Sequence, residues 1–455
     1  MSLILPANSL TGGYEIDNSL RFNDGSSDYL NRTPASAGNR QKFTVSFWTK
    51  RGELSGSYRL FSAGSDGTEC YFGADALAWY YYSGGYIGQY KYQNTALFRD
   101  VSAWYHIIIA IDTTQATASN RVKMYVNGIE GAYTQVTIPQ NTQVDWNNTV
   151  GHYIGRYSAG SSFFYDGYIS EFYNIDGQQL DATSFGEFDS DSGIWKPIKY
   201  TGTYGTNGFY LDFENSGSLG ADQSGNGNNF TVNNLTSIDQ VTDTPTNNFS
   251  TLNPLANGLT MSEGNLSVAG ASDNNTGATI GVKSGKWYWE VKDVGGVSSF
   301  GIANSANRIG TSNQSSATGM YLIQSIGSGS WYSYTNGSFA STSVPVHSAG
   351  DILNFALDAD NGKLYIGKNG SYINSSNSSA NPATDTNPFF SSISTAEFLI
   401  PFTEMRTGGG DADFNFGNPP YSANGYTDGA GYGNFSYAVP SGYYSLNSKN
   451  LAEFG

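Results

Sequence analysis

The stretch RVKMYVNGIE, residues 121–130, contains the pattern on which the rest of the chain is built. Val122, Met124 and Val126 alternate with polar or amphipathic neighbours, which places the three apolar side chains on one face of a β-strand. The strand runs into an Asn-Gly pair at 127–128, the dipeptide that best tolerates the two positive φ angles of a tight hairpin. The stretch therefore predicts an antiparallel strand with one buried and one solvent-facing side.

The same signals recur along the whole chain. Alternation predicts half-buried strands at 43–48, 287–292 and 353–358, and further Asn-Gly pairs stand at 336–337, 361–362 and 369–370. The apolar run Tyr105–Ile111 predicts a central strand that is covered on both faces. One stretch, Asp181–Phe188, hints at a helix, with Asp181 placed to cap a single turn. We therefore expect an all-β protein of antiparallel sandwiches or jelly rolls.

Composition excludes several classes of protein. Charged residues are only 13% of the 455 residues, which is too few for coiled coils or helical repeats, whereas aromatic residues reach 15%. The formal net charge of −16 offers no basic footprint for nucleic acid or anionic lipid. Cys70 is the single cysteine, so neither an intrachain disulfide nor a cysteine-rich metal site is expected. We expect no membrane insertion and, without a secretion signal, synthesis in the cytoplasm of a cell.

Two changes of pattern suggest how the chain is divided. Residues 236–260 are rich in Asp, Thr and Asn, contain Pro245 and Pro254, and show little alternation. After Tyr421, aromatic residues are spaced irregularly among Gly and Ser. We interpret the first change as a domain boundary and the second as the start of an extended tail that packs on something else.

The first half resembles the laminin-G and concanavalin-like lectin fold. The resemblance is carried by the order and spacing of FTVSFWTK (43–50), AWYHIIIAID (103–112), KMYVNGIE (123–130) and YDGYISEFYNID (165–176). One departure is FYLDFENSG, at the start of residues 209–230, which looks like an opening strand but follows the domain. We expect it to close the first sandwich as a permuted strand, the alternative being the stub of a lost repeat.

The second half resembles a SPRY domain, and the whole layout resembles virion proteins of marine tailed phages. The SPRY-like motifs are SGKWYWEVKD (284–293), FGIAN (300–304), GDILNFALDADNGKLYIGKNG (350–370) and DADFNFGNPPY (411–421). That resemblance implies a bent sandwich that recognises partners through its loops and has no catalytic residues. The expected domains are an N-terminal arm over 1–14, a laminin-G/concanavalin-like domain over 15–200, a bridge over 201–258, a SPRY-like domain over 259–421 and an extended tail over 422–455.

The residues themselves argue against catalysis. Glucanases of the concanavalin-like class resemble one another in a Glu-x-Asp-x-x-Glu strand, which carries the nucleophile and the acid. The nearest match begins at Glu187 and Asp189, but Ser192 stands where the second glutamate should be. We therefore interpret these acids as a strand end or loop. The chain has three histidines that could act as a catalytic base, at 106, 152 and 347, but no recognisable nucleophile motif accompanies them. We therefore predict that the protein is not an enzyme.

A cation site is the one cofactor that the sequence leaves open. Asp222, Asn226 and Asn228 alternate in a glycine-punctuated loop, and Asp212 lies before it. Such oxygens suit calcium. The alternative, which we favour, is a turn whose side chains bond to their own backbone.

Aromatic stretches provide the candidate ligand-binding residues, because sugar rings stack on exposed aromatic faces. In the first half these are Tyr80, Tyr82 and Tyr86, and in the second half Trp331 and Tyr334. The alternative in both places is a structural ladder of cross-strand aromatic pairs.

These observations lead to a functional hypothesis with two rivals. We expect a non-enzymatic surface protein of a phage particle, either a tail-fibre or adhesion-type protein or a capsid decoration, that assembles as a homo-oligomer with other virion proteins. Its lectin-like domains would recognise a host-surface glycan or protein receptor. The rivals are a free glycan-binding lectin and a polysaccharide-degrading hydrolase of the concanavalin-like class.

Overall fold

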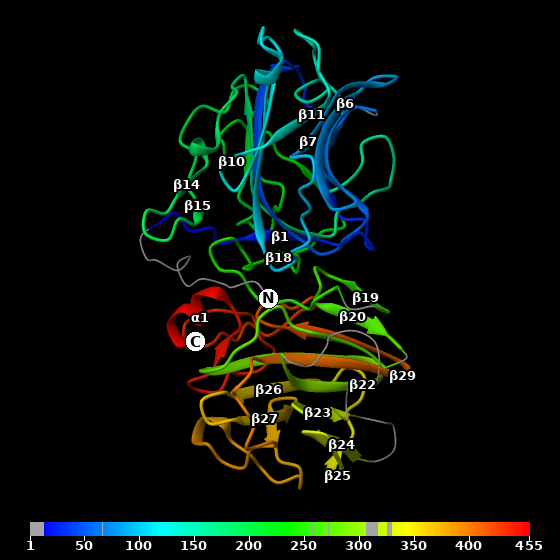
Figure 1. Ribbon diagram of the computed structural model, residues 1–455, viewed down its shortest axis with the longest axis vertical. Coiled ribbons are helices and arrows are strands. Elements are labelled where there is room, and N and C mark those ends of the chain that lie inside the picture. Colours follow the sequence, from blue (N-terminus) through cyan, green and yellow to red (C-terminus); the bar gives the residue numbers. More distant parts are fainter. Residues whose placement is uncertain (1–12, 66, 256–257, 272, 306–316, 325–329) are drawn as a thin grey trace. The chain divides into compact units, whose positions relative to one another are not determined.

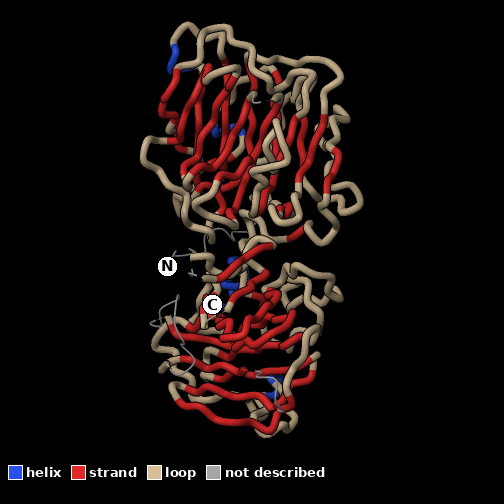
Figure 2. Tube along the Cα trace, turned by 90° about the vertical axis from the view of Figure 1, so that its right-hand side faces the viewer, coloured by secondary structure: helices blue, strands red, loops and turns tan. Residues whose placement is uncertain are grey.

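The computed structural model describes residues 13–65, 67–255, 258–271, 273–305, 317–324 and 330–455. The described residues form two compact units, divided between Asn247 and Asn248. Strands dominate both units (Figure 1, Figure 2), and they pair antiparallel with the exception of one short parallel pair. The all-β prediction is confirmed, and each unit is described below by itself.

The first unit is a sandwich of two sheets. Sheet A has the order β10 (Ile129–Glu130), β9 (Val122–Val126), β8 (Trp104–Asp112), β3 (Lys42–Arg51), β13 (Gly167–Asp176), β1 (Ser19–Phe22) and β18 (Gln240–Val241), with β16 (Phe209–Leu211) also on β13. Sheet B has the order β11 (Ala132–Val136), β7 (Tyr86–Tyr92), β6 (Ala76–Tyr82), β5 (Thr68–Gly73), β4 (Ser57–Ala63), β12 (His152–Ile154), β2 (Tyr29–Arg32) and β17 (Thr231–Asn233).

The core of this unit lies between the two sheets, and alternation identifies its residues. Phe43, Val45 and Phe47 of β3 face Phe61 and Trp79 of sheet B in one apolar cluster. Burying side chains of this size contributes about 1.5–3 kcal/mol each, so this layer is the main source of stability.

The opposite face of sheet A is also buried. The prediction that the strand over 43–48 has one solvent-facing side is therefore wrong. Trp48, Ile108 and Tyr173 point away from the core but are buried in a second apolar cluster with Phe185 and Trp195. The covering residues come from the segment after β13, which includes the hairpin of β14 (Gly186–Phe188) and β15 (Trp195–Pro197). The central run Tyr105–Ile111, in β8, is covered on both faces as predicted, apart from the half-buried Tyr105.

Residues assigned to a bridge between domains belong largely to the first sandwich. The segment 209–230, which we expected to close that sandwich, supplies β16, and β16 pairs with β13. The following strands β17 and β18 pair with β2 and β1. The chain thus returns to both sheets before it leaves the unit at Asn247.

The second unit is a bent sandwich built around two long strands, β22 (Lys286–Asn304) and β29 (Leu399–Asn415), which pair along most of their length (Figure 1). One end of the pair continues on one side through β26 (Ile352–Asp358), β27 (Lys363–Lys368) and β28 (Ser371–Ile373), and on the other through β20 (Ser267–Gly270) and β19 (Leu259–Ser262). The other end is flanked by β21 (Asn274–Gly277) and by β23 (Met320–Gln324), β24 (Ser330–Thr335) and β25 (Ser338–Pro345).

A glycine contact marks the bend between these two layers. The register of β22 on β29 shifts on both sides of Gly295 and Gly296. Gly296 has φ +83, and a Cβ atom there would lie 2.2 Å from the carbonyl oxygen of Gly409. Only glycine permits this approach of two backbones, and the extra residue of a bulge increases local bending.

The segment 422–455 differs from the extended tail that we expected, because it folds onto the second sandwich. It supplies β30 (Tyr444–Ser445), which pairs with β22, and α1 (Ser448–Phe454). Phe435 and Tyr443 are buried against Tyr288, on the face of β22 that alternation had assigned to solvent. The N-terminal arm expected over 1–14 lies mostly outside the described residues.

One buried carboxylate of β22 accepts hydrogen bonds from the main chain of this C-terminal segment. Glu290 of β22 is fully buried and accepts hydrogen bonds from the backbone N–H groups of Ser436 and Tyr437, both at 2.9 Å. The Tyr288 hydroxyl and the Asn415 amide donate to the same carboxylate at 2.8 and 3.1 Å. Burial raises the pKa of Glu290, while these donors act in the opposite direction.

Local turn chemistry follows the sequence closely. The Asn-Gly pairs at 127–128, 336–337 and 369–370 form two-residue hairpin turns with positive φ at both positions. The pair at 361–362 ends a longer loop, in which only the glycine has positive φ. Short 3₁₀ turns occur at Ala118–Asn120, Ala182–Ser184 and Pro382–Thr384.

The helical elements are few. Asp181 caps its turn as predicted, accepting from the backbone N–H of Thr183. Helix α1 was not predicted; it starts at the cap residue Asn447, which accepts from the N–H of Asn450. Within the described part of the chain, no helix combines the length and apolar character that crossing a bilayer requires.

Replacing Glu290 by Gln should release the C-terminal segment. The new amide would present an N–H group to main-chain donors that now have an acceptor, so we expect a loss of about 3 kcal/mol in the stability of the second unit. Thermal unfolding and limited proteolysis of residues 422–455 measure it. Glu453→Gln, the same change on an exposed site of α1, is the control. Equal protease resistance of the two variants would contradict the assignment.

Candidate functional site

The outer face of sheet B carries six aromatic side chains and one arginine that contacts three of them. This set is here called the aromatic face and consists of Arg59, Tyr71, Tyr80, Tyr82, Tyr86, Tyr157 and Phe163. Strand alternation places it there. Cys70, Phe72 and Trp79 point into the core, so their neighbours point outward.

Edge-to-face contacts join the tyrosines across three strands. The ring centroids of Tyr71 and Tyr80 are 5.6 Å apart at an interplanar angle of 74°. Tyr86 lies 5.3 Å from Tyr80 and 5.5 Å from Tyr82, with angles of 86° and 87°. These are favourable arrangements for aromatic pairs and contribute about 0.5–1.5 kcal/mol each. The aromatic stretch of β6 and β7 is therefore a structural ladder, one of the two readings that the sequence allowed.

Arg59 extends the ladder sideways. Its guanidinium lies 4.4 Å from the centroid of Phe163, 4.7 Å from that of Tyr71 and 5.3 Å from that of Tyr157. Its Nε donates to Glu69 at 2.6 Å, and Glu69 is fully buried. Burial, with the nearby Glu69 charge as the second cause, raises the pKa of Tyr80. The ion pair fixes the arginine plane beneath the rings.

Two members of the aromatic face reach solvent. Tyr86, which contacts Tyr80 and Tyr82, is 49% exposed, and Phe163, which contacts Arg59, is 47% exposed. Tyr82 is half-buried, whereas Tyr80 is only 8% exposed and supports its neighbours. Among the predicted residues, Tyr86 and Tyr82 are therefore accessible. Sequence reasoning missed Arg59 and Phe163, because neither lies near the tyrosines along the chain.

The candidate residues of the second half are not available to a ligand. Trp331 is fully buried beside His347 and Phe389. Tyr334 is 8% exposed and donates from its hydroxyl to Gln324 at 2.5 Å. Both residues alternate onto faces that neighbouring loops and strands cover, which corrects their assignment as binding residues.

The loop considered for calcium is held by its own backbone. Asp222 accepts from the N–H groups of Tyr210 at 2.9 Å, Ser224 at 2.9 Å and Asn228 at 2.7 Å. Arg32 donates to the side-chain oxygen of Asn228 at 2.6 Å. These oxygens thus accept hydrogen bonds from protein donors, one of which is the cationic Arg32. They are not arranged around an open site for a metal ion.

The remaining members of that set behave in the same way. The Asn226 amide donates to the carbonyl oxygens of Gly205 and Gly208, and Asp212 accepts from the N–H of Glu214. No group of three or more His, Cys, Asp or Glu side chains suited to a metal ion occurs among the described residues. Calcium binding stays an untested prediction, and the geometry of this loop does not favour it.

The hydrolase-like stretch lies on an exposed hairpin. Lys196 pairs with Glu187 at 3.2 Å and with Asp189 at 3.3 Å. Asp189 also accepts from the N–H and hydroxyl groups of Ser192, which closes the turn between β14 and β15. The two carboxylates thus take part in a turn and an ion pair, and they lie at the strand end and loop that we expected.

The histidines are buried and have structural partners. His106 accepts from the indole N–H of Trp195 at 2.9 Å, contacts Ser46 at 2.8 Å and stacks on Trp48. Burial lowers the pKa of His106, and likewise that of His152, to about 3. The pKa of His347 falls to about 4 for the same reason. The thiol of Cys70 is buried, and burial raises its pKa.

One buried titratable cluster was not foreseen. Glu171 lies at a bulge of β13 with φ +52, and it accepts from the hydroxyls of Tyr14 at 2.8 Å, Tyr173 at 2.6 Å and Tyr210 at 2.6 Å. Burial raises its pKa from 4.5 to about 7 despite these donors. Glu171 is only 4% exposed, so the cluster is closed to a substrate.

Comparison with known proteins finds one family model that matches part of the first unit. Residues 24–177 match the family described as the concanavalin A-like lectin/glucanases superfamily. No curated protein matches the chain. The first unit therefore has a concanavalin-like fold, which is typical of carbohydrate- or protein-binding modules.

Similar solved structures include two SPRY domains and a pentraxin. The TRIM65 PSpry domain shares 16% identity over 36% of this chain and 88% of its own, with a TM-score of 0.28. The SPRY domain of human HERC1 shares 18% identity over 33% and 87%, with a TM-score of 0.25. The heptameric SAP-like pentraxin from Limulus polyphemus shares 16% identity over 37% and 80%, with a TM-score of 0.29.

The Glu171 cluster should make the stability of the first unit depend on pH. The unfolded chain releases this proton near pH 4.5, while the folded chain keeps it until about pH 7, so the contribution of Glu171 to stability falls as pH rises between these values. The lowered pKa values of His106 and His152 act in the opposite direction and are the same in wild type and variant. The contribution of Glu171 amounts to about 3 kcal/mol. Glu171→Gln should remove this contribution alone, so the stability of the variant relative to wild type should increase by about this amount as pH rises through the range.

Urea unfolding between pH 4 and pH 8 measures the difference between wild type and variant. Glu187→Gln, which removes an exposed carboxylate from the same unit, is the control and should retain the wild-type slope. An unchanged pH profile in Glu171→Gln would show that the carboxyl titrates in its ordinary range.

Proposed function

We propose that the chain is a non-enzymatic recognition protein at the surface of a virus particle, and that its first sandwich binds glycans through the aromatic face. The observation that carries the glycan assignment is the pair of exposed rings, Tyr86 and Phe163, on the same aromatic face. The particle location rests on the resemblance of the domain layout to virion proteins.

The aromatic face has the chemistry that saccharides require. Exposed ring faces pack against the C–H surfaces of sugars, and nearby polar groups pair with hydroxyls. The half-buried hydroxyl-bearing side chains of Tyr71 and Tyr82 supply such groups on the same face. Arg59 is buried and paired with Glu69, so it supports the rings. The ladder is pre-organised by its edge-to-face contacts and by the Arg59–Glu69 pair, so little side-chain freedom is lost on binding.

A protein receptor is the second candidate ligand, since exposed Tyr, Phe and Arg are also typical of protein interfaces. Its recognition would need a larger contact area than two rings provide. The hydrolase alternative has less support, because Glu187 and Asp189 share an ion pair on an exposed hairpin.

Removing either exposed ring should weaken glycan binding. We expect Tyr86→Ala and Phe163→Ala each to weaken binding on a glycan array by about tenfold, the loss of one stacked ring. Tyr133→Ala is the matched control, because this tyrosine is 43% exposed on β11 of the same sheet but is not part of the ladder. Equal losses in all three variants, or no array binding by wild type, would contradict the proposal.

The particle location has its own test. Proteomics of gradient-purified particles from the source virus should find the chain at a stoichiometry of several copies per particle, and antibodies should label intact particles. Recovery of the chain only in the particle-free fraction would favour the free lectin. Sedimentation of the purified chain tests the proposed homo-oligomer. Truncation of 422–455 is not a clean assembly test, because that segment completes the second sandwich.

A further inference from the structure

The first sandwich also has a polar pocket, distinct from the aromatic face and formed where β3 begins and β13 ends. Its volume is about 660 Å³, within the range of about 300–1,000 Å³ that is usual for small-molecule sites. The polar side chains that line it are those of Asn39, Arg40, Gln41, Gln143, Asp176 and Thr206.

The lining includes a buried carboxylate. Asp176 is 7% exposed and accepts from the backbone N–H groups of Asn39 at 2.7 Å and Asn207 at 2.9 Å. The amide of Asn147 donates to it at 3.3 Å. All three donors are neutral amides, and no ion pair joins Asp176 to a cationic side chain among the described residues.

Close backbone approach shapes the pocket around Asp176. A Cβ atom on Gly38 would lie 2.2 Å from a carboxylate oxygen of Asp176, and one on Gly205 would lie 2.1 Å from its carbonyl oxygen. Gly205 has φ +76, which glycine adopts without strain. Neither glycine leaves room for a side chain beside Asp176, so the main chain at both positions packs directly against this residue.

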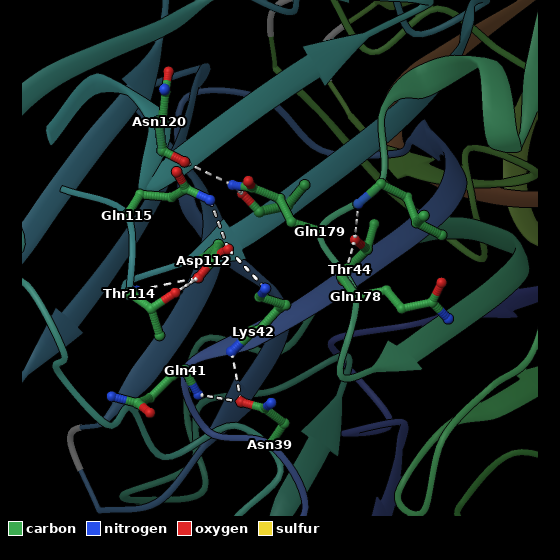
Figure 3. A network of polar contacts seen from close by, with 12 residues as sticks. Asn39, Gln41, Lys42, Thr44, Asp112, Thr114, Gln115, Asn120, Gln178 and Gln179 are labelled. Atoms are coloured by element: carbon green, nitrogen blue, oxygen red, sulfur yellow. Dashed lines mark hydrogen bonds and ion pairs between the residues drawn. The ribbon is translucent and has the colours of Figure 1, made fainter. Parts of the chain in front are cut away.

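A network of polar contacts holds the adjoining rim (Figure 3). The side-chain oxygen of Asn39 accepts from the N–H groups of Gln41 at 3.0 Å and Lys42 at 2.8 Å. Lys42 in turn pairs with Asp112 at 3.0 Å. The rim is thereby ordered before any ligand arrives, which lowers the entropic cost of binding.

The charges select the class of ligand. Arg40 is engaged by Asp145 at 3.4 Å and by the carbonyl oxygen of Val144 at 2.8 Å, so its charge is balanced locally. Asp176 would repel a ligand carboxylate but accept a hydrogen bond from a ligand hydroxyl. The side-chain amides of Gln41 and Gln143 can donate to or accept from further hydroxyls.

We propose that this pocket binds a neutral hexose ring as a second saccharide site. The inference rests on the proposed function in one respect, namely that the natural ligands of the first unit are glycans. It differs in the residues involved, because no member of the aromatic face lines the pocket.

The test uses the full chain and three probes: methyl α-glucoside, methyl α-mannoside and glucuronate. Saturation-transfer NMR titrations should show binding of at least one neutral hexoside, with glucuronate weaker by about tenfold. Thr206→Trp fills the pocket from an exposed position and should weaken hexoside binding by at least about tenfold. Thr201→Trp, an exposed threonine of the same segment outside the pocket, should bind as wild type does.

Three results would overturn the pocket assignment: no hexoside binding by wild type, unchanged binding in Thr206→Trp, or tighter binding of glucuronate than of either hexoside. The variant Tyr86→Ala separates this proposal from the first. Hexoside binding that persists in Tyr86→Ala and disappears in Thr206→Trp supports the pocket whatever the array shows. Array binding that survives Thr206→Trp while hexoside binding is absent from wild type rejects the pocket alone.

Discussion

The first sandwich depends on one constraint: strand β13 is buried along its entire length and on both of its faces. Its ten residues pair with β3 on one side and with β1 and β16 on the other. Such a strand is stable only if every main-chain polar group is paired and if apolar side chains cover both surfaces. The chain meets this condition by returning to sheet A after β13, with the covering segment that contains Phe185 and Trp195 and with β16.

The polar features of the unit follow from the same strand. The bulge at Glu171 places a carboxylate among tyrosine hydroxyls where a regular strand would place an apolar residue. The last residue, Asp176, lies where the strand meets the loops, and these loops supply its N–H donors. A buried charge is costly unless it is paired or hydrogen-bonded, so each carboxylate fixes the position of the segments that solvate it. Glu290 has the same role in the second unit.

The sequence predicts strand faces well because alternation is a local property. It correctly separates Phe43 from Thr44 and Trp289 from Glu290, and Asn-Gly pairs mark the hairpins at 127–128 and 369–370. It fails on what covers the second face. Thr44 and Glu290 are buried by segments that lie more than 100 residues further along the chain, and a local pattern carries no information about those contacts. The same reasoning missed α1, whose seven residues have too short a periodic pattern.

The candidate site shows the same limit in another form. A dense aromatic stretch of the sequence was sufficient to find Tyr80, Tyr82 and Tyr86, which are close along the chain. The sequence did not predict how much their exposure to solvent differs. Arg59 and Phe163 join them through the packing of β4 and of the loop before β13. An aromatic ladder both stabilises a sheet and presents rings to solvent, and these roles are divided among its members. Tyr80, in the middle, contacts both Tyr71 and Tyr86, while Tyr86 and Phe163 have free ring surface. The proposed recognition by this face needs no cleft, because the sheet beneath it holds the rings in place.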